Sequence, residues 1–296
     1  MKPQVITRRD FLRDSAAATL AGTFLLGSGQ RLSAQTTKTT RVILIRAQDV
    51  LDDRNTINVP VLNQMLDESV ATLVNENDPL QAWRQLIKPD DMVGIKTNRY
   101  PSLPVPSELE QALKGRVRDA GVDEENISIL DGGVLEDPIF QKATALINTR
   151  PMRAHSYSGV GTCIKNYIRF IPDRPSIHPD GCAELASIWK LPIVRGKTKL
   201  NILVMLTPLF HTSGMRVSPQ YLWTYKGLVV GTDPVAVDAT GLRIIQAKRN
   251  IYFGEERQLN PPPKHIQVAD IKYGLGTSDP EKIELIKLGW QEGALI

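Results

Sequence analysis

The sequence predicts an α/β fold: a largely parallel or mixed sheet flanked by helices, with a less regular C-terminal half. Short apolar runs of strand length alternate with segments whose apolar residues recur at helical spacing. Proline and glycine clusters separate these segments. Strands and helices that alternate in this way are typical of a sheet whose strands are joined by helical connections.

The elements of the first half follow this pattern clearly. The β-branched run Arg41–Arg46 predicts the first strand, and the helical spacing of apolar residues in Val61–Val74 predicts the first helix. A short helix is expected over Leu80–Ile87, before a strand at Met92–Ile95. Ser107–Ala120 predicts the next helix, which the following glycine ends.

The later elements alternate less regularly. Strands are expected at Ile127–Leu130 and Ala143–Asn148, and helical segments at Val160–Ile171 and Cys182–Lys190. The remaining expected elements are strands at Leu200–Leu206 and Leu222–Val230, a helix at Val235–Ala247 and a surface loop at Tyr252–Lys264.

Residues 1–34 have the layout of a twin-arginine export signal. Arg8 and Arg9 precede Phe-Leu and a further cation, and a short apolar stretch follows over Ala16–Leu26. Small residues up to Ala34 fit a cleavage site, which would leave 35–40 as a flexible new N-terminus and 41–296 as a single domain. We therefore expect a periplasmic or extracytoplasmic protein that meets the twin-arginine translocase during export. The apolar stretch is too short to span a bilayer, so no stable membrane insertion is expected after cleavage, although an uncleaved anchor is the alternative.

Charge and cysteine content narrow the classes of partner and cofactor. Five of the 36 basic and two of the 32 acidic residues lie in residues 1–34, so the rest of the chain is almost neutral. No basic stripe interleaved with aromatic residues follows, which argues against a nucleic-acid partner. Cys163 and Cys182 could pair in an oxidising compartment or stay as buried thiols. Two cysteines cannot supply a four-cysteine site, so no iron–sulfur cluster is expected, whereas a divalent metal stays open.

Polar residues follow several expected strands. Open α/β sheets bind ligands in the crevice beyond the carboxyl ends of their strands, so residues at these positions are candidates for one site. The candidates are Asp49, Asp52, Asp53, Lys96, Asn98, Asp131, Arg153, His155, His211, Asp233 and Asp238.

The sharpest local motif is Gly231–Gly241. Asp233 and Pro234 predict a helix start, with the aspartate as N-cap and the proline at the first helical position. Asp238, one turn later, either forms a structural ion pair or contacts a metal or a substrate hydroxyl. Carboxylate and imidazole groups bind divalent ions, and any such site must draw on distant segments. The candidate metal ligands are Asp131, Asp233 and His211.

A glycine- and hydroxyl-rich turn over His155–Gly161 precedes a helical segment that carries Lys165 and Asn166. The free N–H groups of such a helix start can bind an anion, although a simple capped helix is the alternative. The turn has neither the spacing of a dinucleotide fingerprint nor that of a P-loop.

The order of the motifs resembles a family known as domain of unknown function 362. The motifs are Gly94–Asn98, Pro151–Ser156, Ile164–Asn166, Gly231–Asp238 and Gly274–Gly276, and the resemblance covers roughly residues 41–289. Members of that family often carry an export signal of this kind or a ferredoxin module. This chain has the layout of the export signal and lacks the cysteines of the ferredoxin module. The family name implies no reaction.

Two departures from the family pattern concern the candidate site. The family usually has Lys-Thr-His where this chain has Arg153, Ala154 and His155, and lysine and arginine are not interchangeable in a defined contact. Its lysine-proline-asparagine appears here as Lys96-Thr97-Asn98. If the family site is catalytic, Ala154 raises the alternative of a member that binds without turnover.

The leading hypothesis is an exported enzyme, or enzyme-like protein, that acts on a small anionic ligand or a metal-bound cofactor at the strand ends. The expected ligand-binding residues are Lys96, Asn98, Arg153 and Asn166, and the expected catalytic residues are His155, Asp238 and Lys165. His155 is the proton-transfer candidate because an unperturbed imidazole has a pKa of about 6.5. The alternatives are a non-catalytic periplasmic binding or redox-partner module and a purely structural subunit.

Overall fold

The structure, a computed structural model, describes residues 39–212, 214 and 217–296. The expected export signal at 1–34, with Arg8 and Arg9, and most of the expected flexible segment 35–40 lie outside the described residues. Residues Lys38–Ile296 form one compact unit, and the fold below is that of this unit. No helix in the described part of the chain combines the length and apolar character needed to cross a bilayer.

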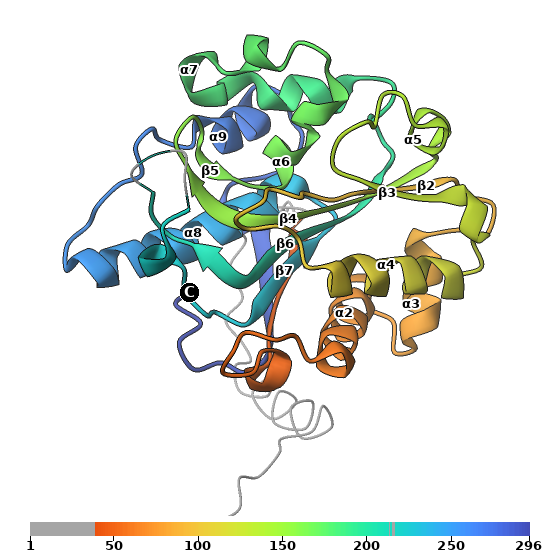
Figure 1. Cartoon of the computed structure of the whole chain (residues 1–296), viewed down its shortest axis with the longest axis horizontal. Helices are drawn as coiled ribbons and strands as arrows, with labels where there is room; N and C mark the ends of the chain where they lie inside the picture. The colour runs from red at the N-terminus through yellow and green to blue at the C-terminus, as the bar shows by residue number, and fades with distance from the viewer. Residues whose placement is uncertain (1–38, 213, 215–216) are drawn as a thin grey trace, which may run out of the picture. The chain divides into compact units, whose positions relative to one another are not determined.

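The described residues contain eight strands in one mixed sheet, in the order β3-β2-β4-β6-β7-β1-β8 with β5 paired to β4 (Figure 1). The strands are β1 (Thr40–Arg46), β2 (Val93–Lys96), β3 (Ile127–Leu130), β4 (Ala145–His155), β5 (Gly159–Gly161), β6 (Thr198–Leu209), β7 (Gly227–Gly231) and β8 (Ile283–Gly289). β3, β2, β4 and β6 are parallel, whereas β7 runs antiparallel to β6 and to β1. β1 therefore points the same way as the first four strands, with β8 parallel to it.

Helices cover both faces of the sheet, which confirms the predicted fold class (Figure 1). On one face lie α2 (Val59–Val74), α3 (Pro79–Leu86) and α4 (Ser107–Asp119). The other layer contains α5 (Pro138–Lys142), α6 (Cys163–Asn166), α7 (Pro179–Cys182), α8 (Pro234–Phe253) and α9 (Lys264–Ile271). Short 3-10 segments occupy Gln48–Val50, Glu124–Asn126, Tyr167–Phe170, Arg174–Ile177, Ala183–Lys190, Pro219–Tyr221 and Pro280–Lys282.

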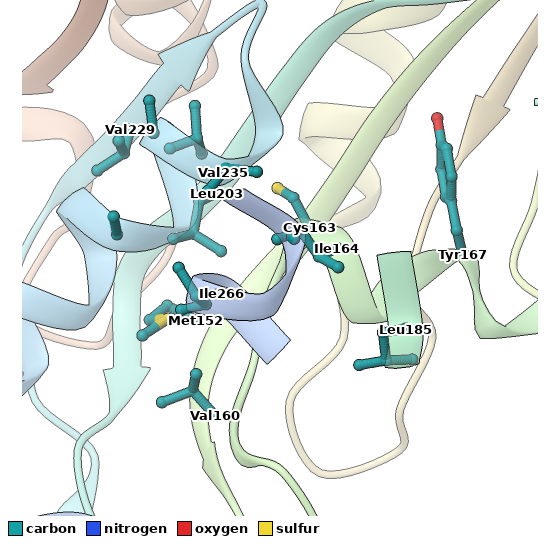
Figure 2. Close-up of a cluster of buried hydrophobic side chains, with 14 of the residues drawn as sticks. Met152, Val160, Cys163, Ile164, Tyr167, Leu185, Leu203, Val229, Val235 and Ile266 are labelled. Carbon is teal, nitrogen blue, oxygen red and sulfur yellow. The ribbon is translucent and has the colours of Figure 1, made fainter. Parts of the chain in front are cut away.

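Each face of the sheet has its own apolar core because successive side chains of a strand point to opposite faces. In β1, Ile43 belongs to the core under α2, whereas Leu44 belongs to the core under α8. Figure 2 shows part of the second core, where Cys163 and Ile164 of α6 lie near Leu203 of β6 and Val235 of α8. A helix of four residues cannot be stable alone, so its position depends on this packing.

The later elements differ most from the sequence prediction. β4 continues beyond Asn148 to His155, and the expected helix over 160–171 divides into β5, α6 and a 3-10 turn. β5 pairs with β4 across a tight turn, in which Gly159 adopts a positive φ of 71°. α9 and β8 were not predicted; β8 is largely half-exposed and pairs with β1 from the opposite end of the chain.

Candidate functional site

The carboxyl ends of β2, β3 and β4 meet at one edge of the sheet. Lys96, the last residue of β2, pairs with Leu130 of β3 and with Asn148 of β4. β4 continues past this level to His155 and forms a wall beside the ends of its two neighbours. A cavity of about 430 Å³, which we call the cationic cavity, opens here, and it is lined among others by Asn98, Asp131 and His155.

Positive side chains dominate the lining of the cationic cavity. They are Arg99, Arg150, Arg153, Lys165, Arg169 and Arg174. Among the described residues, Asp131 is the one carboxylate that lines the cavity, and its Oδ1 lies 3.0 Å from Lys96 Nζ and 3.8 Å from Arg169 Nε. The cavity therefore carries a strong positive potential.

Two of these arginines are buried and incompletely paired. Arg150 is 3% and Arg153 is 7% exposed, and the buried Nε of each has no hydrogen-bond partner in the described part of the chain. Burial and then the charge of Arg153 lower the pKa of Arg150 to about 9, and burial also lowers the pKa of Arg153. The Arg153 guanidinium lies 3.9 Å from the centre of the Tyr100 ring. The charge of Asp131 opposes both guanidinium groups and that of Asp238 also opposes Arg150, but neither arginine forms an ion pair within the described residues. Buried like charges that are incompletely paired are costly, so this pair favours a bound anion.

The conformation of β4 places both guanidinium groups at one cavity. Three positions along a regular strand would put Arg150 and Arg153 on opposite faces. The pairing of β4 with β6 changes register between Pro151 and Arg153, and irregularities of this kind re-aim side chains. A Cβ at Gly161 would lie 2.8 Å from an Arg150 guanidinium nitrogen, so the glycine leaves the space that this side chain occupies.

Lys96 lies behind the cavity and does not line it. Its ammonium group is completely buried and donates to the Thr97 carbonyl, to Asp131 and to Asn166. These contacts use all three donors of a lysine, which leaves none for a ligand. Burial lowers the pKa of Lys96 to about 8 against the opposing effect of Asp131. The direct ligand contact expected for Lys96 does not fit this geometry, and Lys96 instead positions Asp131 and Asn166.

Asp131 and Asn98 complete the β2–β3 side of the cavity. Burial tends to raise the pKa of Asp131, but the charge and hydrogen bond of Lys96 keep it below the ordinary value. Asp131 also accepts the backbone N–H of Arg99 at 3.1 Å. The buried Oδ1 of Asn98 has no partner among the described residues. Asn98 is thus the better placed of the two to accept a hydrogen bond from a ligand.

The short helix α6 brings Lys165 and Asn166 to the cavity. The Asn166 amide donates to the Lys96 carbonyl, to Asn148 Oδ1 and to the Thr149 carbonyl, so it joins α6 to β2 and β4. Lys165 Nζ lies 3.2 Å from Cys182 Sγ, and burial lowers the pKa of Lys165. Cys182 and Cys163 are free, buried thiols.

Asp238 holds the start of α6 through hydrogen bonds and does not line the cationic cavity. Its carboxyl group is fully buried and accepts the N–H groups of Cys163 and Ile164 at 2.9 and 2.8 Å. Burial raises the pKa of Asp238 to about 7 despite these hydrogen bonds. The expected contact between Asp238 and a substrate hydroxyl is therefore not formed by this geometry, and Asp238 is a positioning residue for Lys165.

His155 is neutral in this environment. Burial, together with the charges of Lys165, Arg150 and Arg153, lowers the pKa of His155 to about 2. Its Nδ1 accepts the backbone N–H of Tyr157 at 3.1 Å, which assigns the proton to Nε2. With so low a pKa the imidazole presents a hydrogen-bond donor in the protein alone, and the proton-transfer role of His155 stays a prediction.

The three expected metal ligands do not come together. β7 runs opposite to its neighbours, so Asp233 follows it at the other edge of the sheet from Asp131. Asp233 caps α8 as predicted, accepting the N–H groups of Val235 and Ala236, and also accepts that of Thr277. His211 Nδ1 lies 2.8 Å from an Arg249 nitrogen. No group of three or more metal-binding side chains occurs among the described residues.

Four cavity cations were not predicted from the sequence: Arg99, Arg150, Arg169 and Arg174. Arg150 lies in the part of β4 that was expected to be a loop, and Arg169 and Arg174 lie in or beside 3-10 turns of the irregular second half. No apolar run marks this extension of β4, because polar residues predominate from Asn148 to His155. The sequence therefore holds no clear local signal for Arg150.

The fold and the cavity define an α/β protein with a cationic site beyond the ends of parallel strands. Residues 123–243 match the model of a family described as Domain of unknown function (DUF362). This segment contains β3, β4, α6 and the beginning of α8, and with them Asp131, Arg153, His155 and Lys165. The match supports the resemblance over this segment; Lys96 and Asn98 lie before it. No curated protein and no solved structure matches the chain.

We expect Asp238→Ala to lower the free energy of unfolding by about 2–6 kcal/mol at pH 5, because two buried N–H groups lose their acceptor at about 1–3 kcal/mol each. The pKa of Asp238 rises from 3.8 to about 7 on folding, so over that range the folded protein keeps a proton that the unfolded chain has lost. Its contribution to stability therefore falls as the pH rises, and the deficit of the variant shrinks towards pH 7. Urea unfolding across this range measures the effect.

Asp119→Ala, at an exposed ion pair with Arg116, is the control and changes stability by less than about 0.5 kcal/mol. A deficit that grows with pH would contradict the assignment.

We expect the imidazole of His155 to remain neutral, with its proton on Nε2, between about pH 5 and 8. The physical reason is its burial beside three cationic side chains. Two-dimensional NMR of the histidine ring resonances, assigned with His155→Gln, measures both the charge and the tautomer. A titration of His155 near its ordinary pKa would show that the surrounding charges are better screened than this arrangement implies.

Proposed function

We propose that the protein binds a small oxyanion-bearing molecule in the cationic cavity. The observation that carries the proposal is the pair of buried arginines, Arg150 and Arg153, whose Nε atoms have no partner in the described residues. Guanidinium groups suit phosphate and carboxylate geometry because they donate two parallel hydrogen bonds. Lys165 adds a third buried cation beside them. A phosphate or carboxylate placed here offsets the mutual repulsion of these charges.

The same arrangement supports distinct roles for two neighbouring side chains. His155 donates from Nε2 to the ligand, because its Nδ1 already accepts the Tyr157 N–H. Lys165 is the proton-transfer candidate, since burial lowers its pKa and its Nζ lies 3.2 Å from the Cys182 thiol, which carries no charge of its own when protonated. An exported enzyme or enzyme-like protein that acts on a small anionic ligand is thus our leading proposal.

A non-catalytic binding module is the second candidate, and one observation favours it. Ala154 lines the two smaller cavities next to the cationic cavity and is 4% exposed. A threonine at this position, as in the related family pattern, would place a hydroxyl beside the site, and alanine offers none. Turnover of bound ligand separates the two candidates, and binding is common to both.

We expect Arg153→Met to weaken the binding of inorganic phosphate by about tenfold to a hundredfold. Hydrogen bonds to charged groups contribute about 1.5–3 kcal/mol, and 1.4 kcal/mol is a tenfold change in affinity. Isothermal titration calorimetry at low ionic strength measures the dissociation constant. The thermal midpoint of the free variant should stay the same or rise, because one of the mutually repelling buried cations is removed.

The matched control for Arg153 is Arg118→Met. Arg118 is an exposed arginine of α4 whose nearest acidic partner, Glu124, lies 3.5 Å away on the surface. It should leave phosphate affinity within about twofold, since exposed pairs contribute little. Equal phosphate affinity in the wild type and in Arg153→Met, or no binding of any oxyanion by the wild type, would contradict the proposed function.

We also propose that the protein is exported by the twin-arginine route, supported by the arrangement of Arg8, Arg9 and the apolar stretch Ala16–Leu26. Replacing both Arg8 and Arg9 by lysine should leave the full-length chain in the cytoplasm. Arg13→Lys is the control, because it keeps the pair and the third cation. Fractionation with immunoblotting gives the readout; export of the double variant at the wild-type rate would refute this route.

A further inference from the structure

A second, smaller cavity adjoins the cationic cavity. It measures about 190 Å³. Tyr100, Arg153, His155 and His178 line both cavities, so the two share a wall and a single molecule can extend across their boundary. We call the smaller one the aromatic cavity because the rings of Tyr100, His155, Tyr157 and His178 line it.

The lining of the aromatic cavity consists mainly of rings and apolar groups. Tyr157 lies with its ring centre 5.1 Å from that of His178 and 6.0 Å from that of His155. Leu209 and Ala154 add buried apolar surface. Tyr157 is 47% exposed, so part of its ring is accessible from solvent. Rings that are fixed and accessible in this way offer faces and edges to another planar group.

The size of the aromatic cavity suits one aromatic ring. An engineered apolar cavity of about 150 Å³ is large enough to bind benzene. The aromatic cavity exceeds that volume and opens directly toward Arg153, whose guanidinium is already stacked on Tyr100. A planar ring in this place would carry its substituent into the cationic cavity.

We infer that the ligand is an aromatic molecule that bears a phosphate or carboxylate group close to its ring. The anionic group lies between Arg150, Arg153 and Lys165, and the ring lies against Tyr100 and Tyr157. This inference rests on the proposed anion-binding function and adds the chemical class of the rest of the molecule. A simple alkyl phosphate fills the cationic cavity alone and leaves the aromatic cavity to water.

The test compares phenyl phosphate with methyl phosphate by isothermal titration calorimetry on the wild-type protein, with benzoate and acetate as the carboxylate pair. We expect the aromatic member of at least one pair to bind tenfold or more tightly than its alkyl partner. Tyr157→Ser should reduce this ratio to within twofold of one, whereas Tyr157→Phe should preserve it. Tyr252→Ser is the matched control because Tyr252 is 49% exposed and does not line either cavity, so it should leave the ratio unchanged.

Each outcome separates the two proposals. Equal affinity for the aromatic and alkyl members of both pairs overturns the aromatic inference and leaves the anion site intact. A tenfold preference that survives Tyr157→Ser overturns the assignment of the aromatic cavity. Failure of all four compounds to bind overturns the anion-binding function and the inference with it. Circular dichroism of the Tyr157 variants confirms that they are folded.

Discussion

The contact between Asp238 and the start of α6 is the interaction on which the candidate site depends. α6 is a single turn, and a helix of this length has too few internal hydrogen bonds to be stable alone. Inside the core, the Asp238 carboxyl group accepts two free N–H groups of α6. The hydroxyl oxygen of Thr162, the residue before α6, lies 3.3 Å from Nε2 of the buried His265. The position of Lys165 beside the cavity therefore follows from a carboxyl group on a different helix.

The candidate site contains buried positive charges that lower the stability of the fold. Arg150 and Arg153 are both buried. Their charges are opposed by Asp131, which is already bonded to Lys96, and in the case of Arg150 also by the buried Asp238. A protein selected for stability alone would replace such a pair by apolar groups. The electrostatic cost of burying these like charges arises next to a cavity. Costly arrangements of charge are commonly found at binding sites.

The sequence located part of the site and misplaced the rest for identifiable reasons. The rule that ligands bind beyond parallel strands correctly grouped Asn98, Asp131, Arg153 and His155 around the ends of β2, β3 and β4. It failed for Asp233, because a sequence pattern does not reveal that β7 runs in the opposite direction. Arg150 was missed because β4 extends further than its apolar run suggested and changes register near Pro151.

The sequence by itself determined the fold class and most of the strands and helices of the first half. It also determined the capped start of α8 at Asp233 and Pro234. These features depend on side-chain period and on contacts within a few residues. Strand order, strand direction and the protonation of His155, Lys96 and Asp238 were decided only by the tertiary structure. They depend on backbone pairing and burial between segments that are far apart in the chain, and no local pattern records those distances.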